Sequence, residues 1–227
     1  MKNIKYIVIF LLSFIVFTVL GWIISDNIIN FITASVPSSI KIIALNPIEV
    51  FTTVFNIAIL FSLAVNLPLI LYMIIKYVTP AMKLNEKSIM RKLLLIGPIL
   101  FTFGAVISFI GFVIFGLKWF ANFNVAYGFE TLWSLQQTIN TILILSFISG
   151  IVFEFPLVLY YLIKNNILSF ELTTKSRAFF LIGLLLIIGL ITPDGSLFTQ
   201  LFLSIPIYGL MELSIYFGNK NKEEILC

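Results

Sequence analysis

The sequence predicts an all-α integral membrane protein with six transmembrane helices. Three observations support this fold class: the composition, the long apolar runs, and the alternation of basic residues between those runs. Hydrophobic residues make up 60% of the 227 residues and charged residues only 11%, whereas soluble domains average roughly half and a quarter. Because the bilayer core holds no water, long apolar runs must form helices whose backbone groups pair within the segment.

A helix needs about 20 apolar residues to cross a bilayer. Hydropathy along the chain predicts spans at residues 4–24, 51–78, 93–117, 138–163, 178–191 and 197–217. The first span has the outline of a secretory signal peptide, but it is long for one and no small-x-small cleavage site follows. The fifth span is short and ends at the turn Thr-Pro-Asp-Gly of residues 192–195. We expect residues 1–227 to form a single polytopic membrane domain.

Basic residues lie mostly on one side of these spans. The other side has only Lys41 and Lys118 of the 14 Lys and Arg residues. The positive-inside rule therefore predicts that both termini lie on the inner side of the membrane. The twelve residues expected inside are Lys2, Lys5, Lys76, Lys83, Lys87, Arg91, Lys92, Lys164, Lys175, Arg177, Lys220 and Lys222.

The two long outer connections are predicted at residues 26–50 and 118–137. The second is rich in aromatic residues, among them Trp119, Phe123 and Trp133. Aromatic side chains are ordinary anchors at the membrane interface. The alternative is an outer cap that shields a cavity, and the sequence leaves both interpretations open.

A polar residue, a spacer and a proline recur in the three helices predicted to run inward. The prolines are Pro68, Pro156 and Pro206, and the polar residues two positions earlier are Asn66, Glu154 and Ser204. Proline removes one intrahelical hydrogen bond and crowds the carbonyl four residues earlier, which bends a helix. We therefore expect three bent helices that together form a concave wall.

Glu154 is the most unusual residue of the predicted spans. It lies roughly 25 Å from the outer end of its helix at the rise of an α-helix. A carboxylate at that depth is costly unless it faces protein or water. It either makes a structural hydrogen bond to a neighbouring helix, or contacts a polar group on an incoming helix, or takes part in proton movement. Gln200 could hydrogen-bond across helices in similar surroundings.

The sequence offers no enzymatic constellation. It contains no histidine, and its one cysteine is Cys227, so ordinary zinc sites and histidine-based catalysis are not expected. No P-loop, Gly-x-Ser-x-Gly or metal-ligand spacing occurs. We expect no catalytic activity, no metal and no cofactor, and we assign the net charge of +4 to membrane topology and not to nucleic-acid binding.

Several short motifs resemble the TatC family, the multi-spanning subunit of the twin-arginine protein translocase. The stretch 147–156, which ends Phe-Glu-Phe-Pro, is similar to the family's Phe-Glu-x-Pro signature in helix four. The stretch 46–51, Asn-Pro-Ile-Glu-Val-Phe, is similar to the family's Pro-x-Glu-x-Phe. Each motif is weak alone, and their order and spacing over residues 46–217 are specific. Further matching positions are Pro68, Tyr72, Pro80, Glu86, Lys87, Arg177, Pro193, Asp194, Gln200, Pro206, Tyr208 and Glu212.

Some positions depart from the family pattern. Residues 1–6 do not match the segment like His-Leu-x-Glu-Leu-Arg that usually precedes helix one. Asn56 stands where a lysine is common, and Met73 stands where a glutamine is usual. In the family the first segment and the inner loop after helix two together receive the signal. The resemblance therefore implies that Glu86 carries more of this task here.

The resemblance implies the core of a twin-arginine translocase, driven by the proton-motive force and embedded in a lipid bilayer. Its partners would be single-span TatA-like and TatB-like subunits and twin-arginine precursor proteins, in an oligomeric complex. Glu86 and Lys87 would recognise the signal, while Glu154, Gln200 and Asn66 would contact partner or signal helices. The remaining assigned residues would shape kinks and the outer cap; they are Pro68, Pro156, Pro206, Pro47, Glu49 and Phe51.

The expected location is the cytoplasmic membrane of a prokaryote, with the mitochondrial inner membrane or the thylakoid membrane as alternatives. Two other functions stay open at this point. One is a proton- or ion-coupled solute transporter that uses Glu154, and the other is a structural membrane subunit of a respiratory complex. Glu86 is alternatively a solvated surface charge.

Overall fold

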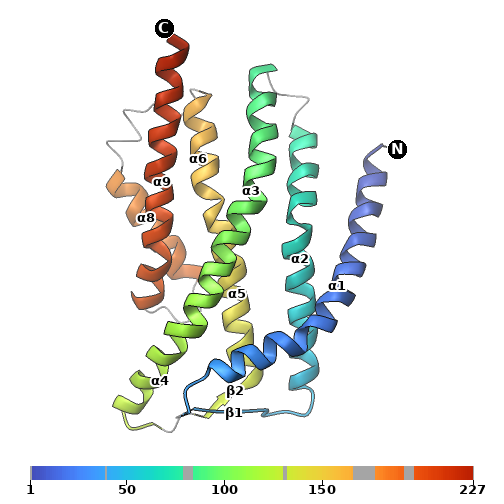
Figure 1. Ribbon diagram of the computed structural model, residues 1–227, viewed down its shortest axis with the longest axis vertical. Coiled ribbons are helices and arrows are strands. Elements are labelled where there is room, and N and C mark those ends of the chain that lie inside the picture. The colour runs from blue at the N-terminus through green and yellow to red at the C-terminus, as the bar shows by residue number, and fades with distance from the viewer. Residues whose placement is uncertain are drawn as a thin grey trace. The chain divides into compact units, whose positions relative to one another are not determined.

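The computed structural model describes residues 2–38, 40–78, 84–129, 132–165, 177–191 and 197–226. The described chain is almost entirely helical, with two short strands near one another (Figure 1). The elements, in chain order, are α1 (Lys2–Ser35), β1 (Lys41–Ile43), α2 (Glu49–Val78), α3 (Leu84–Gly111), the π-helix η2 (Phe112–Gly116), α4 (Leu117–Ala126), β2 (Leu132–Ser134), α5 (Leu135–Phe153), α6 (Phe155–Lys164), α8 (Arg177–Ile191) and α9 (Leu197–Leu226).

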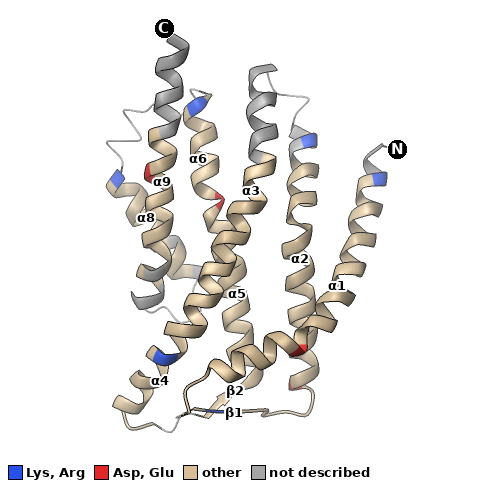
Figure 2. Ribbon diagram, viewed as in Figure 1, with Lys and Arg blue, Asp and Glu red and all other residues tan. Residues whose placement is uncertain are grey.

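Every predicted span coincides with helical backbone, except at Glu154 within the span 138–163. Among the described residues, 4 helical stretches are long and apolar enough to cross a membrane: Lys5–Ser35, Glu49–Ile74, Leu94–Ala126 and Leu135–Lys164. Two shorter apolar stretches, Arg177–Leu190 and Leu203–Tyr216, correspond to the fifth and sixth predicted spans. Figure 2 shows Lys and Arg near the ends of the described helices, as expected where a charge in the bilayer centre is costly.

Both predicted outer connections contain more helix than the sequence suggested. The prediction of a loop from residue 26 is wrong for its first part, since α1 continues to Ser35. The loop predicted from residue 118 is likewise helical as far as Ala126 in α4. Residues 117–126 contain no proline or glycine that would break a helix. The helix ends at Ala126, two residues before Gly128, whose φ of 77° lies in the left-handed region that glycine adopts readily.

The chain divides into two units by its internal contacts. Unit 1 is Met1–Met73 with Ala105–Phe147, and unit 2 is Ile74–Gly104 with Ile148–Cys227. The core of unit 1 joins α1, α2, η2, α4 and α5 through Ile32, Ile57, Phe112, Val113, Leu117, Ile139, Ile142 and Leu145.

Unit 1 also contains the two strands. β1 pairs with β2 in parallel, with Lys41 opposite Leu132 and Ile43 opposite Ser134. The pairing ties the connection before α2 to the connection before α5. We use the name outer cap for residues 40–49 with 132–136, which this pairing joins. The cavity that such a cap would shield stays a prediction.

The core of unit 2 lies along α9. The end of α5, α8 and α9 pack through Phe153, Leu184, Ile188, Leu203 and Ile207. Further along, α6 and α9 pack through Leu159, Ile163, Met211 and Ile215. Phe153, the last residue of α5, is fully buried in this core.

Candidate functional site

Glu154 belongs to unit 2 and lies at a break between α5 and α6. The single helix predicted at 138–163 is divided into α5 and α6, and Glu154 is the residue between them. Its φ of −73° and ψ of −22° keep the chain close to helical geometry. The break is therefore a local interruption of hydrogen bonding, and the chain continues from α5 directly into α6.

Pro156 explains this interruption. It stands in the first turn of α6, where its missing N–H removes the bond that the carbonyl of Val152 would receive. The Glu154 N–H instead bonds the Ile151 carbonyl at 3.0 Å, three residues back. The next turn is regular again, since the N–H groups of Leu157 and Val158 both donate to the Glu154 carbonyl.

The Glu154 carboxyl group is incompletely satisfied. The residue is half-buried, and its Oε1 atom is buried with no hydrogen-bond partner among the residues that the structure describes. A buried polar atom without a partner costs free energy, more so when the group is charged. The structural hydrogen bond considered for this residue from the sequence is not present at Oε1. The Oε1 atom therefore has hydrogen-bonding capacity that the described residues do not use.

Asn66 has a different environment. It is buried in unit 1, where its side-chain oxygen accepts from the Ser13 hydroxyl of α1. Its amide nitrogen donates to the Ser62 carbonyl at 2.8 Å, and the Ser62 hydroxyl donates to the Phe14 carbonyl at 2.8 Å. These bonds link α1 to α2 inside the bilayer region. The predicted contact of Asn66 with a partner helix stays a prediction.

Gln200 lies in the first turns of α9, against α8. A Cβ atom built on Gly189 of α8 would lie 2.8 Å from the Gln200 Nε2 atom. The glycine therefore makes room for the amide between the two helices. Gln200 and Glu154 both belong to unit 2.

The other two kink prolines lie inside continuous helices. Pro68 is within α2 and Pro206 is within α9. Of the three repeated prolines, only Pro156 coincides with a break in the helix. The same polar-x-proline spacing therefore accompanies a break in one helix and leaves the other two helices continuous.

Glu49 holds the outer cap of unit 1 together. Its Oε2 atom accepts from the backbone N–H groups of Leu45 and Asn46. Its Oε1 atom accepts from the Ser134 hydroxyl and from the Gln136 N–H, the latter at 2.8 Å. The carboxylate thus bridges the two connections that β1 and β2 pair. Pro47 lies two residues before it, in the turn that leads into α2.

Phe51 lies on the outside of α2 and is largely exposed. Its ring packs edge-on against Trp22 of α1, with 5.6 Å between the ring centroids, and stacks with Phe55. Phe51 thus lies where α2 contacts α1, and its predicted place in the outer cap stays a prediction.

Glu86 and Lys87 lie in the first turn of α3 by their backbone. Their side chains lie outside the described residues. The predicted role of Glu86 and Lys87 in signal recognition stays a prediction.

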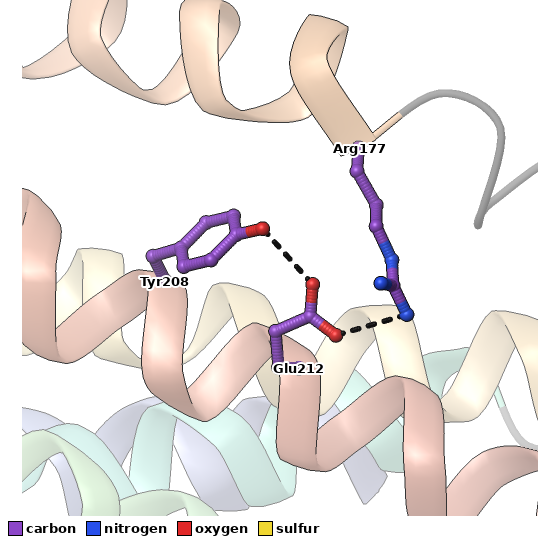
Figure 3. A network of polar contacts seen from close by, with 3 residues as sticks. All are labelled: Arg177, Tyr208 and Glu212. Carbon is purple, nitrogen blue, oxygen red and sulfur yellow. Dashed lines mark hydrogen bonds and ion pairs between the residues drawn. The ribbon is translucent and has the colours of Figure 1, made fainter.

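Sequence reasoning missed a polar network between α8 and α9. The Arg177 guanidinium and the Glu212 carboxylate form an ion pair at 3.1 Å, and the Tyr208 hydroxyl donates to Glu212 at 3.0 Å (Figure 3). All three residues were noted singly as family positions. The available signal was a basic residue at the start of one helix and an acidic residue midway along the next helix. Among the described residues, no group of three metal-ligating side chains occurs.

Comparison with known proteins gives consistent matches along the chain. The family model described as Sec-independent protein translocase protein (TatC) matches residues 4–206. A Sec-independent protein translocase protein TatC of Carboxydothermus hydrogenoformans is 29% identical over 93% of this chain and 87% of its own length. One of Aquifex aeolicus is 31% identical over 82% of this chain and 78% of its own length. A crystal structure of a twin arginine translocase receptor, TatC, has a TM-score of 0.76 and 25% identity, covering 96% of this chain and 97% of its own.

Proposed function

This chain belongs to the TatC family of Sec-independent protein translocase proteins, and we propose that it receives the N-terminal signals of folded precursors and recruits single-span partner subunits. It is a membrane-embedded transport component and not an enzyme. The similar crystal structure is that of a translocase receptor, which supports a receiving role for this chain.

The single observation that carries the proposal is that the Oε1 atom of Glu154 has no hydrogen-bond partner in the described part of the chain. A helix that brings a polar group to this depth supplies the missing hydrogen bond. The gain is large because the alternative for both groups is an unsatisfied polar atom in apolar surroundings. Gln200 and Asn66 are the further proposed contacts for partner or signal helices.

Glu86 is the proposed acceptor of the paired arginines of a signal. Arginines stay charged and pair with carboxylates in a fixed, two-pronged geometry. Lys87 lies beside Glu86 in the first turn of α3, and its charge disfavours cations that lack this paired contact. Recognition in this form takes place at the inner membrane surface.

The proposed setting is the cytoplasmic membrane of a prokaryote, with both termini inside. The distribution of Lys and Arg supports this orientation, and the bacterial relatives support the membrane. Transport draws on the proton-motive force, and the chain works in an oligomeric complex with TatA-like and TatB-like subunits.

Signal recognition is tested by crosslinking. A photoreactive residue is placed next to the arginine pair of a signal peptide, and the yield of crosslinks to this chain is measured in membranes. Glu86→Gln is expected to lower the yield about tenfold, because hydrogen bonds between charged groups contribute roughly 1.5–3 kcal/mol. Glu223→Gln removes the same charge elsewhere and is expected to leave the yield unchanged. Equal yields for wild type and Glu86→Gln would refute this role of Glu86.

Partner recruitment is tested by affinity purification in a mild detergent. The wild-type chain is expected to carry single-span subunits with it, and Glu154→Ala is expected to carry less. Purification of the wild-type chain without any single-span subunit contradicts the proposal. Ion flux in proteoliposomes that contain this chain alone would contradict it as well, and would favour a solute transporter.

A further inference from the structure

Helices α3 and α5 approach each other closely through two glycines, each covered by a phenylalanine of the other helix. A Cβ atom built on Gly104 of α3 would lie 2.5 Å from Cγ and 2.8 Å from Cβ of Phe153. A Cβ atom built on Gly150 of α5 would lie 2.6 Å from the Phe101 ring and 3.0 Å from the Phe101 carbonyl oxygen. We call these four residues the glycine–phenylalanine interlock.

The two rings have little freedom to move away. Phe153 is fully buried and Phe101 is 3% exposed. The Phe153 ring packs edge-on against Phe103, with 6.2 Å between the ring centroids. Phe153 also belongs to the core formed with α8 and α9. A methyl group at position 104 would meet the stem of this side chain as well as its ring. In a closely packed interior such an addition forces neighbouring groups to shift.

Two other glycines of unit 2, Gly183 and Gly209, have open surroundings. A Cβ atom on Gly183 of α8 or on Gly209 of α9 would meet nothing within 4 Å. Alanine is a better helix former than glycine by roughly 1 kcal/mol, so glycine has a conformational cost at all four positions. At positions 104 and 150 the close approach of α3 and α5 explains why glycine is present despite this cost.

The interlock lies directly before the helix break. Phe153 is the last residue of α5, and Glu154 follows it. Because Phe153 directly precedes Glu154, the packing of the Phe153 ring constrains the position of the turn that carries the Glu154 carboxyl group. The Ser149 hydroxyl, one turn earlier, contacts the Gly104 carbonyl at 3.5 Å and adds a polar link between the same two helices.

We propose that Gly104 and Gly150 are positioning residues for Glu154, which rests on the proposed role of Glu154 in contacting a partner or signal helix. By allowing Phe153 and Phe101 to interlock, the two glycines hold α5 against α3 and keep the Glu154 carboxyl group where an incoming helix meets it. The interlock acts only through Glu154 and touches no partner itself.

The experiment compares alanine variants by per-copy transport, defined as the transport rate of a twin-arginine reporter divided by the amount of this chain in the membrane. Gly104→Ala and Gly150→Ala are expected to lower per-copy transport about tenfold, since small misplacements of a functional group have large effects. They are also expected to lower crosslinking from a photoreactive residue in the partner helix to this chain. Gly183→Ala and Gly209→Ala are the matched controls and are expected to stay within about twofold of wild type.

A second substitution tests the contact itself. Phe101→Leu removes the ring atom nearest Gly150 and is expected to restore transport to Gly150→Ala, but not to Gly104→Ala. If Gly104→Ala does not accumulate, Phe153→Leu replaces it. This variant loosens the interlock without a clash and is expected to lower per-copy transport about threefold.

The outcomes separate this proposal from the proposed function. Wild-type per-copy transport in both glycine variants, with Glu154→Ala inactive, overturns the positioning role and leaves the function of Glu154 intact. Rescue of both glycine variants by Phe101→Leu overturns it as well, because a general loosening would then explain the effect. Wild-type transport by Glu154→Ala would instead remove the role of Glu154 on which the proposal rests. Where Phe153→Leu replaces Gly104→Ala, its wild-type per-copy transport also overturns the positioning role.

Discussion

Glu49 in unit 1 and Glu154 in unit 2 are two buried or half-buried carboxylates with opposite environments. Both oxygens of Glu49 accept hydrogen bonds, from three backbone N–H groups and one hydroxyl. The Oε1 atom of Glu154 is buried without a partner among the described residues. The hydrogen-bonding capacity of Glu49 is used within the fold. That of the Glu154 Oε1 atom is not used by the described residues.

This difference separates structural from functional roles in a chain with few charges. A carboxylate that satisfies several donors stabilises the segments that supply them. A carboxylate that the fold leaves unsatisfied is kept at a cost, and such costs are typical of sites that act on another molecule. We therefore expect substitution of Glu49 to lower abundance, and substitution of Glu154 to lower per-copy transport.

The largest loss of abundance is expected for Glu49→Ala. The substitution removes the acceptor for four donors in the outer cap, and buried donors without partners destabilise a fold. The amount of membrane-inserted protein should fall at least about fivefold, since modest losses of stability already change abundance several-fold. Glu49→Gln keeps one acceptor oxygen, so its abundance should lie between those of wild type and Glu49→Ala. Quantitative immunoblotting of membranes measures this, and unchanged abundance in Glu49→Ala would remove the structural role.

A loss of thermal stability, smaller in effect than that of Glu49→Ala, is expected for Gly21→Ala in α1. The added Cβ atom would lie 2.9 Å from the Ala58 Cα atom of α2, a backbone atom that cannot rotate away. Overpacking of this kind costs roughly 1–3 kcal/mol. Thermal unfolding in detergent should show a lower midpoint, while Gly209→Ala should show no such decrease. A midpoint equal to wild type would mean that α1 and α2 are less tightly packed than the structure indicates.

A weaker effect on stability is expected when the hydrogen bond between Ser13 and Asn66 is removed. The two side chains hydrogen-bond between α1 and α2, and such bonds in membranes average roughly 0.6 kcal/mol, with a maximum of about 1.7 kcal/mol. A double-mutant cycle of Ser13→Ala and Asn66→Ala measures their coupling. Loss of per-copy transport in Asn66→Ala but not in Ser13→Ala would support the predicted contact of Asn66 with a partner helix.

The smallest effect is expected for the ion pair of Arg177 and Glu212. Their side chains are 46% and 32% exposed, and exposed pairs contribute at most about 1 kcal/mol. Arg177→Gln and Glu212→Gln should each shift the unfolding midpoint slightly, and salt should reduce the shift. A shift as large as that of Gly21→Ala would show that the pair clamps α8 to α9.

Much of the fold was predictable because hydropathy is a local property. All six spans and the exceptional position of Glu154 follow from residue order alone. The last part of α1 and nearly all of α4 were missed because their polar and aromatic residues resemble a loop in composition. The break at Glu154 could be anticipated only as a bend, since proline does not interrupt α2 or α9.

The details of the site depended on contacts between distant residues. Glu49 and Ser134 are 85 residues apart in the sequence, and nothing local pairs them. The same holds for Gly104 and Phe153, whose contact requires the packing of α3 on α5. Family resemblance supplied Glu49, Glu154 and Gln200 as positions, and the structure supplied their different environments.

The contrast between the two carboxylates is decided by measuring abundance and per-copy transport together for Glu154→Ala and Glu49→Ala. We expect Glu154→Ala to accumulate like wild type and to lose at least about tenfold in per-copy transport. Glu49→Ala should show the reverse, with low abundance and per-copy transport near that of wild type. Low abundance with normal per-copy transport in Glu154→Ala would contradict a functional role, because Glu154 would then be a structural residue like Glu49.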